Sequence, residues 1–198
     1  MKKKSIIVVA IVIFSVAIVG EAFYSSILNQ ASGASINTVQ AFLTINGIPG
    51  DSTNPNHNGA IALGSFNWTE LQPIAVRSAG GGGGQQSVHF SDFTFTALCS
   101  SASPKLFLDC ATGVSISKAV LSVERTSDDK STDFLVWTLS NVVISSYTVS
   151  FNTNNGAPMD KFSISFAKAQ VTYLPLNPNG SYGSPVQAGF DISANKAV

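Results

Sequence analysis

The 198-residue sequence has few charged residues and no excess of either sign. Charged side chains make up 11% of it, and eleven lysines and arginines balance eleven aspartates and glutamates. Nucleic-acid binding usually requires a basic face, because the ligand carries a dense row of phosphate charges. We therefore expect no nucleic-acid partner. The 44% of hydrophobic residues suffices for one ordinary core, and the length is too short for two full domains.

Cysteine and histidine are also scarce, with two residues of each. His57 and His89 stand apart from Cys99 and Cys110, so the paired ligand spacing of a structural zinc site is missing. Neither histidine belongs to a motif that supplies a nucleophile and an orienting acid. We therefore predict no catalytic residues, no metal site and no cofactor, and expect that the protein is not an enzyme.

The five consecutive glycines at 80–84 do not form a phosphate-binding loop. Such a loop ends in Gly-Lys-Ser or Gly-Lys-Thr and opens a helix, whose amide groups help to hold the anion. Here two glutamines and a serine follow the glycines, and the residues after them alternate as in a strand. We expect the run to be a mobile connection between two strands.

The N-terminus has the pattern of an export signal. Three lysines precede residues 5–20, which carry no charge. As a helix this stretch would be roughly 24 Å long, short of the ~30 Å hydrocarbon core of a membrane. Gly20 and Ala22 are small residues that suit cleavage before Phe23. An uncleaved anchor is the alternative, because apolar residues resume at Phe23.

These observations predict three segments and an exported protein. Residues 1–22 are a signal peptide or membrane anchor, residues 23–38 a polar linker, and residues 39–198 the folded domain. The expected location is secreted, periplasmic or cell-surface, with membrane contact only through residues 1–22 if they are not cleaved. In such a compartment Cys99 and Cys110 can form a disulfide, worth about 3 kcal/mol if unstrained. Two buried thiols are the alternative.

From residue 39 onward, short alternating runs separated by turn residues predict a mainly β domain. A closed or nearly closed barrel is the expected arrangement, because closure removes exposed sheet edges. One short helix is predicted over residues 101–113, with a serine N-cap, Pro104 in its first turn and Gly113 after its end. Leu106, Phe107 and Cys110 should face the open end of the barrel. Strands are expected at 41–45, 60–69, 87–97, 118–124, 134–139, 142–151 and 160–174, with a final short strand after 186.

A polar, asparagine-rich loop at 51–59 is the candidate for contact between subunits or rings. It is long for a hairpin connection, and a plain solvated loop is the alternative. Trp68 and Trp137 are expected to serve packing in the core or between subunits rather than ligand binding. The residues proposed for the contact are Asp51, Ser52, Asn56 and His57.

Several short strings occur along the domain in a distinctive order and spacing. They are FLTINGIPGDS at 42–52, GSFNW at 64–68, the glycine run leading into FTFT at 93–96, SPKL at 103–106 with ATG at 111–113, FAK at 166–168 and GFDISANK at 189–196. Together they resemble the Hcp family, the tube-forming proteins of type VI secretion, over nearly all of residues 39–198.

This resemblance implies a β-barrel with a flanking helix that assembles as a six-membered ring. In the family such rings can stack, the pore carries or chaperones secreted cargo, and there is no catalytic site. The N-terminal segment departs from the family pattern, because tube proteins leave through the secretion apparatus without a cleavable signal. The alternative is an exported monomeric β-barrel that binds a carbohydrate or a surface ligand.

Overall fold

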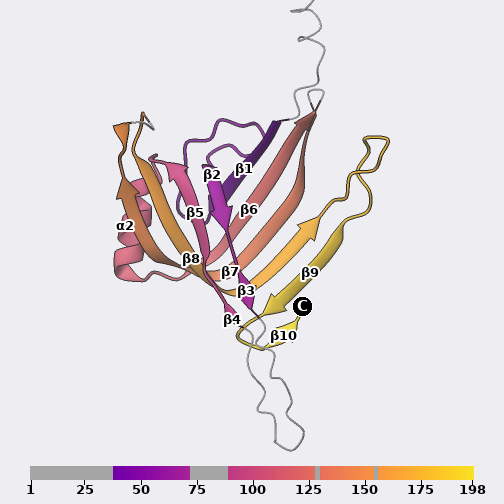
Figure 1. Ribbon diagram of the computed structural model, residues 1–198. Coiled ribbons are helices and arrows are strands. Elements are labelled where there is room, and N and C mark those ends of the chain that lie inside the picture. Colours follow the sequence, from indigo (N-terminus) through magenta and orange to yellow (C-terminus); the bar gives the residue numbers. More distant parts are fainter. Residues whose placement is uncertain (1–37, 72–88, 128–129, 154–155) are drawn as a thin grey trace, which may run out of the picture. The chain divides into compact units, whose positions relative to one another are not determined.

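The computed structural model describes residues 38–71, 89–127, 130–153 and 156–198, and in these ranges it has ten strands and one α-helix (Figure 1). The predicted signal or anchor at 1–22, nearly all of the predicted linker, and the glycine run at 80–84 lie outside the described residues. The elements are β1 Thr38–Ile45, β2 Ile61–Asn67, β3 Glu70–Leu71, β4 His89–Phe90, β5 Phe93–Leu98, α2 Ser103–Thr112, β6 Ile116–Ser127, β7 Lys130–Ser150, β8 Met159–Tyr173, β9 Val186–Asp191 and β10 Lys196–Ala197.

Six of the strands close into a barrel. The main sheet has the order β10-β9-β8-β5-β2-β1-β6-β7, and β7 also pairs with β8, so the sheet returns on itself. β9 and β10 continue the sheet outward from β8, beyond the closed part. The predicted mainly β barrel with one short helix is thus confirmed for the described residues.

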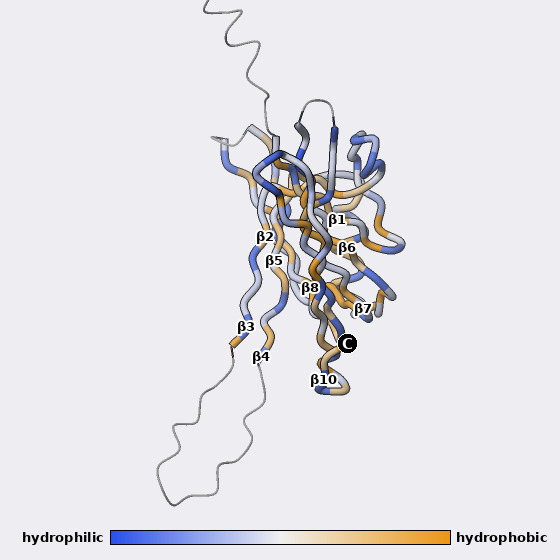
Figure 2. Tube along the Cα trace, turned by 90° about the vertical axis from the view of Figure 1, so that its right-hand side faces the viewer, coloured by the Kyte–Doolittle hydropathy of each residue, from blue (hydrophilic) through white to orange (hydrophobic). Residues whose placement is uncertain are grey.

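The interior of the barrel is filled by the alternating apolar positions of its strands. In β5, Phe93, Phe95 and Ala97 are buried and the residues between them are not. The other strands add their own inward positions, and Figure 2 shows hydrophobic positions along β5, β6 and β8. The largest buried side chains include Leu43, Ile61, Phe93, Phe95, Leu121, Leu139, Ile144, Phe162 and Ile164.

β7 is one long strand where the sequence predicted two, at 134–139 and 142–151. The ladder to β8 continues from Ser140 paired with Lys168 to Val142 paired with Phe166. Asn141 lies between them with a φ of 51°, a left-handed conformation that asparagine tolerates better than most residues. The break in alternation therefore marks a local irregularity inside a strand and not a turn.

The helix begins and ends close to the prediction, with two differences. Its N-cap is Ala102, whose methyl side chain cannot accept a hydrogen bond, and Ser103 is the first helical residue and donates its hydroxyl to Asp160. Leu106 is buried and Cys110 packs against the core, but Phe107 is 59% exposed. Gly113 ends the helix as expected, with a φ of 64° and its N–H donated to the Asp109 carbonyl at 3.0 Å.

The predicted strand at 87–97 is divided. β4 pairs with β3 in a separate two-stranded sheet, while β5 pairs with β2 and β8 in the barrel.

In the described ranges no helix is long and apolar enough to span a membrane.

Candidate functional site

The loop between β1 and β2, residues 46–60, is ordered by its own backbone. Gly50 donates its N–H to the Gly59 carbonyl at 2.8 Å, and Ser52 donates to the Ala60 carbonyl at 3.0 Å. The two sides of the loop approach so closely at Gly50 that a Cβ atom there would lie 2.4 Å from the Ala60 carbonyl oxygen. Only glycine fits at this position. Residues 46–60 are called the β1–β2 loop below.

A buried carboxylate of the barrel wall holds the tip of this loop. Glu124 of β6 is 1% exposed, and its two oxygens accept hydrogen bonds from the side-chain amides of Asn54 at 2.8 Å and Asn56 at 2.7 Å. Burial by itself would raise the pKa of Glu124, but these amide hydrogen bonds and the nearby His57 outweigh it and lower the pKa. Glu124 is therefore a charged anchor for the β1–β2 loop.

His57 completes this anchor. Its ring is stacked on Phe42 of β1, with the ring centroids 4.5 Å apart and an interplanar angle of 16°. Its Nε2 lies 2.9 Å from Oδ1 of Asp133 in β7 and 3.6 Å from Oε2 of Glu124. The imidazole thus joins the loop to two strands of the barrel.

The four residues proposed for a subunit contact lie in two places. Asn56 and His57 are directed to Glu124, and His57 is buried within the subunit. The exposed Asp51 instead accepts hydrogen bonds from the hydroxyl and backbone N–H of Ser101, which lower its pKa. Ser52 accepts from the Asn54 backbone N–H at 3.2 Å. Contact of this loop with another subunit stays a prediction.

Glu124 and Asp133 belong to this site but were missed from the sequence. They lie 67 or more residues from His57, on two different strands, so no local spacing links the three. The sole hint is a charged residue, Glu124, at the end of a run of strand residues that is otherwise apolar or small.

A second buried carboxylate, Asp160 of β8, fastens α2 to the barrel. It is 1% exposed and accepts from the hydroxyls of Ser103 at 2.5 Å and Tyr147 at 2.8 Å and from the thiol of Cys99 at 3.1 Å. Burial, and next the bond to Asp160, raise the pKa of Tyr147 to about 12 and also raise the pKa of the Cys99 thiol.

The structure has Cys99 and Cys110 as free, partly buried thiols rather than as the disulfide that the sequence permits. Cys99 lies just after β5 and directs its sulfur to Asp160, whereas Cys110 lies on α2 and packs against the core. The Cys99 thiol thus has the Asp160 carboxylate, and not Cys110, as its partner.

Trp68 and Trp137 serve packing, as expected. Trp68 stacks on Phe93 with ring centroids 5.3 Å apart and meets Trp137 at 5.1 Å, and its Nε1 donates to the Ser91 carbonyl at 3.0 Å. A pocket of about 170 Å³ lies beside this aromatic cluster. Its lining includes Trp68, Phe90, Trp137 and Phe190.

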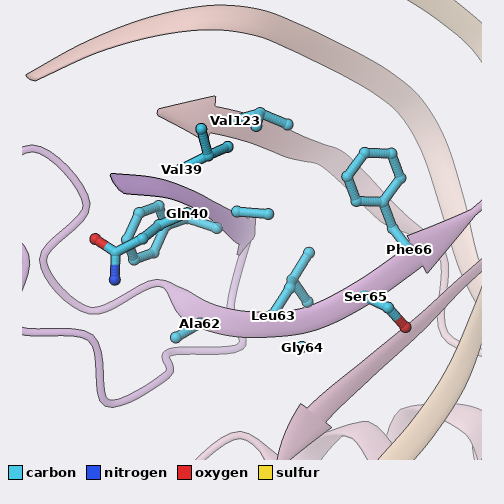
Figure 3. Close-up of a pocket in the computed structure, with 10 residues that line it drawn as sticks. Val39, Gln40, Ala62, Leu63, Gly64, Ser65, Phe66 and Val123 are labelled. Atoms are coloured by element: carbon cyan, nitrogen blue, oxygen red, sulfur yellow. The ribbon is translucent and has the colours of Figure 1, made fainter. Parts of the chain in front are cut away.

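A larger pocket, of about 430 Å³, opens where β1 and β2 separate (Figure 3). The two strands are paired only from Ala41–Leu63 to Leu43–Ile61. Beyond these pairs Val39 and Phe66 line the gap between the strands (Figure 3). None of the residues that line this pocket is acidic or basic, so it offers apolar contact rather than acid–base chemistry.

Large apolar side chains are exposed at several places in the described residues, and most of them come from two groups of elements. The first apolar surface comes from α2 and the ends of β5 and β7, and consists of Leu98, Phe107, Leu108, Val149 and Phe151. The second apolar surface comes from β8, β9 and the segments next to them, and consists of Tyr173, Leu176, Val186 and Val198. Figure 1 places α2 and β9 on opposite sides of the view.

A closed β-barrel with one flanking helix is the fold of several solved type VI secretion proteins. The structure of one type six secretion system protein has a TM-score of 0.75 and 21% identity, covering 81% of this chain and 100% of its own. The crystal structure of Hcp1 from Salmonella typhimurium has a TM-score of 0.67 and 26% identity, covering 81% of this chain and 99% of its own.

Sequence comparison agrees with the fold. The family model described as "Type VI secretion system effector, Hcp" matches residues 42–173. Protein hcp1 of Pseudomonas aeruginosa is 27% identical over 109 residues, which cover 54% of this chain and 67% of that protein. The chain therefore belongs to the Hcp family, as the order of its short sequence strings indicates.

Proposed function

We propose that the chain is a structural protein that assembles with copies of itself into a ring of six subunits. The rings stack and carry secreted effector proteins as cargo, and the protein works by assembly and binding rather than by catalysis. The observation that carries this proposal is membership of the Hcp family over the length of the barrel, together with the two apolar surfaces.

The two apolar surfaces suit a ring because a cyclic assembly needs two different faces on each subunit. One face of a subunit packs against the other face of its neighbour, and repetition closes the ring. Exposed apolar patches on a soluble barrel are typical of protein interfaces. The first and second apolar surfaces come from different elements, with Phe107 of α2 in one and Val186 of β9 in the other.

The mass of the full-length protein tests the ring. In mild detergent, which prevents association through the N-terminal segment, light scattering after size-exclusion chromatography should give close to six chain masses. Phe107→Ser on the first apolar surface should shift the protein toward the monomer, whereas Val39→Ser, a control at an exposed valine outside both surfaces, should not. A strict monomer at micromolar concentration would refute the ring.

We also propose that the protein is exported, with residues 1–22 as a cleaved signal or, if uncleaved, as a membrane anchor. The charge pattern of residues 2–20 supports this. N-terminal sequencing of the exported product tests it: a start at Phe23 identifies a cleaved signal. An intact Met1 on protein in the membrane fraction identifies an anchor, and intact protein only in the cytoplasm contradicts export.

The aromatic pocket beside Trp68 favours one alternative, a monomeric binding module for a carbohydrate or surface ligand. Aromatic faces are common in such sites, but Trp68 is already stacked on Phe93 and its Nε1 is bonded to Ser91. Glycan-array binding by a monomer, lost in Phe90→Ala, would support the module over the ring.

A further inference from the structure

His57, Glu124 and Asp133 form a cluster of metal-ligand type that lies outside the first and second apolar surfaces. Each offers one ligand atom, and these atoms all lie within 4.8 Å of one another. The three come from different elements: the β1–β2 loop, β6 and β7. One imidazole nitrogen and two carboxylate oxygens are a mixed set that suits divalent transition metals rather than calcium.

Two of the three distances between ligand atoms are close to those around a tetrahedral ion. Metal–ligand bonds of about 2.1 Å place two ligand atoms of a tetrahedral site about 3.4 Å apart. His57 Nε2 lies 2.9 Å from Asp133 Oδ1 and 3.6 Å from Glu124 Oε2, on either side of that value. Small movements of the side chains would therefore bring all three atoms into the coordination sphere of one ion.

The charges around the cluster also favour a cation. Glu124 and Asp133 are both acidic, and within the described ranges His57 is the sole basic side chain that pairs with either of them. Asn54 and Asn56, which bond Glu124, are neutral donors. A neutral imidazole would leave two carboxylates close together, and a divalent ion would balance them.

The surroundings already hold the ligands in place. Asn54 and Asn56 orient the Glu124 carboxylate, and Phe42 fixes the plane of the His57 ring. Such outer contacts are what metal sites use to hold their first ligands. The Asp133 side chain is 33% exposed, so an ion can enter from solvent on that side, whereas His57 is 8% and Glu124 1% exposed.

We propose that His57 Nε2, Glu124 Oε2 and Asp133 Oδ1 bind one Zn²⁺ ion, or a chemically similar divalent metal, with water in the fourth position. The ion takes the lone pair of Nε2, and the proton of the neutral imidazole is then carried by Nδ1. The bound ion then joins the tip of the β1–β2 loop to β6 and β7.

Calorimetric titration of the full-length protein with ZnCl₂ tests the site. We expect one ion to bind per chain. His57→Gln and Asp133→Asn should weaken binding tenfold or more. His89→Gln, a control at the other, exposed histidine, should bind as the wild type does. Asp133→Asn removes a partly exposed ligand, so it tests the site even if the variant at the buried His57 fails to fold.

Co²⁺ in place of Zn²⁺ separates this site from the cysteines. Binding at His57, Glu124 and Asp133 gives d–d absorption without a thiolate charge-transfer band. A charge-transfer band, the absence of stoichiometric binding, or unchanged affinity in both His57→Gln and Asp133→Asn would each overturn the proposal. These readouts are independent of ring formation, so failure of one proposal leaves the other standing.

Discussion

Glu124 and Asp160 are two carboxylates buried in the barrel wall, and each serves several polar donors. Glu124 accepts from two asparagine amides, and Asp160 accepts from two hydroxyls and a thiol. A buried carboxylate is costly unless hydrogen bonds satisfy it, and both residues meet that condition. Glu124 holds the β1–β2 loop in this way, and Asp160 holds α2.

Asp160→Ala should be strongly destabilising, because it leaves Ser103, Tyr147 and Cys99 without their acceptor. We expect the free energy of unfolding to fall by about 3 kcal/mol, measured by urea denaturation. The control is Asp92→Asn at an exposed acid that accepts from Ser145, with an expected loss of less than about 1 kcal/mol. Equal losses in the two variants would contradict the assigned role of Asp160.

Tyr147 should make the protein sensitive to alkali. Its pKa of about 12 in the folded chain lies above the value of 10.0 that a free phenol has. Above pH 10 the phenol ionises in the unfolded chain but stays neutral in the folded one, so unfolding is favoured. This contribution to stability is complete below pH 10 and is lost as the pH rises toward 12.

Denaturation midpoints measured between pH 9 and pH 12 check this expectation. Tyr147→Phe cannot ionise, so its stability should decline less over that range than that of the wild type. Tyr173→Phe, a control at an exposed tyrosine, should follow the wild type. Parallel curves for Tyr147→Phe and wild type would show that the phenol of Tyr147 ionises normally.

The β1–β2 loop is the element that joins most of the polar features of the site. Its stem is held by backbone hydrogen bonds at Gly50 and Ser52, and its tip by Glu124 and His57. Because the tip is bonded to the barrel from several sides, the loop presents a fixed surface. A fixed loop loses less conformational entropy on contact with another subunit than a mobile one would.

Gly50→Ala should open the stem of this loop. The new Cβ would meet the backbone of Ala60 and Ile61, which cannot move without breaking the neighbouring hydrogen bonds. We expect a loss of about 2–3 kcal/mol in the free energy of unfolding and faster amide exchange at Ser52 and Gly59. Gly47→Ala, the control, adds a Cβ in open space at a φ of 81°, and should cost only about 1 kcal/mol. A similar loss in both would mean that crowding at Gly50 is unimportant.

α2 shows how far an element could be predicted from its own residues. From Pro104 and Gly113 the two ends of the helix could be predicted to within two residues, because proline and glycine each restrict the backbone of the turn in which they lie. The Ala102 cap and the exposed Phe107 were not predicted. They depend on tertiary contacts: Ser103, as the first helical residue, donates its hydroxyl to Asp160 of β8, and the exposure of Phe107 depends on how the helix lies on the barrel.

For the molecule as a whole, the pairing of β7 with β8 closes the barrel. This pairing is long, running from Leu135–Tyr173 to Ser150–Met159. β3, β4 and β10 have two residues each and lie outside the closed part of the sheet. Stability should therefore differ between these regions.

Hydrogen exchange followed by mass spectrometry should reveal this difference. Amides near Leu139, Ile144 and Ile164 should exchange slowest, since they open only when the barrel unfolds. Amides of β3, β4 and β10 should exchange fastest among the strands. If β7 and β10 exchanged at similar rates, closure through β7 and β8 would not be the main source of stability.

The sequence by itself determined the position of most of the barrel strands, the helix ends to within two residues, the mainly β class and the family resemblance, because each follows from local alternation, turn residues or ordered strings. Only the tertiary structure decided the functional clusters. His57, Glu124 and Asp133 meet because β1, β6 and β7 are neighbours in the sheet, and Cys99 turns to Asp160 because β5 pairs with β8. Local sequence patterns reflect only residues that are close along the chain, whereas these side-chain clusters form through pairing between strands that are distant in the sequence.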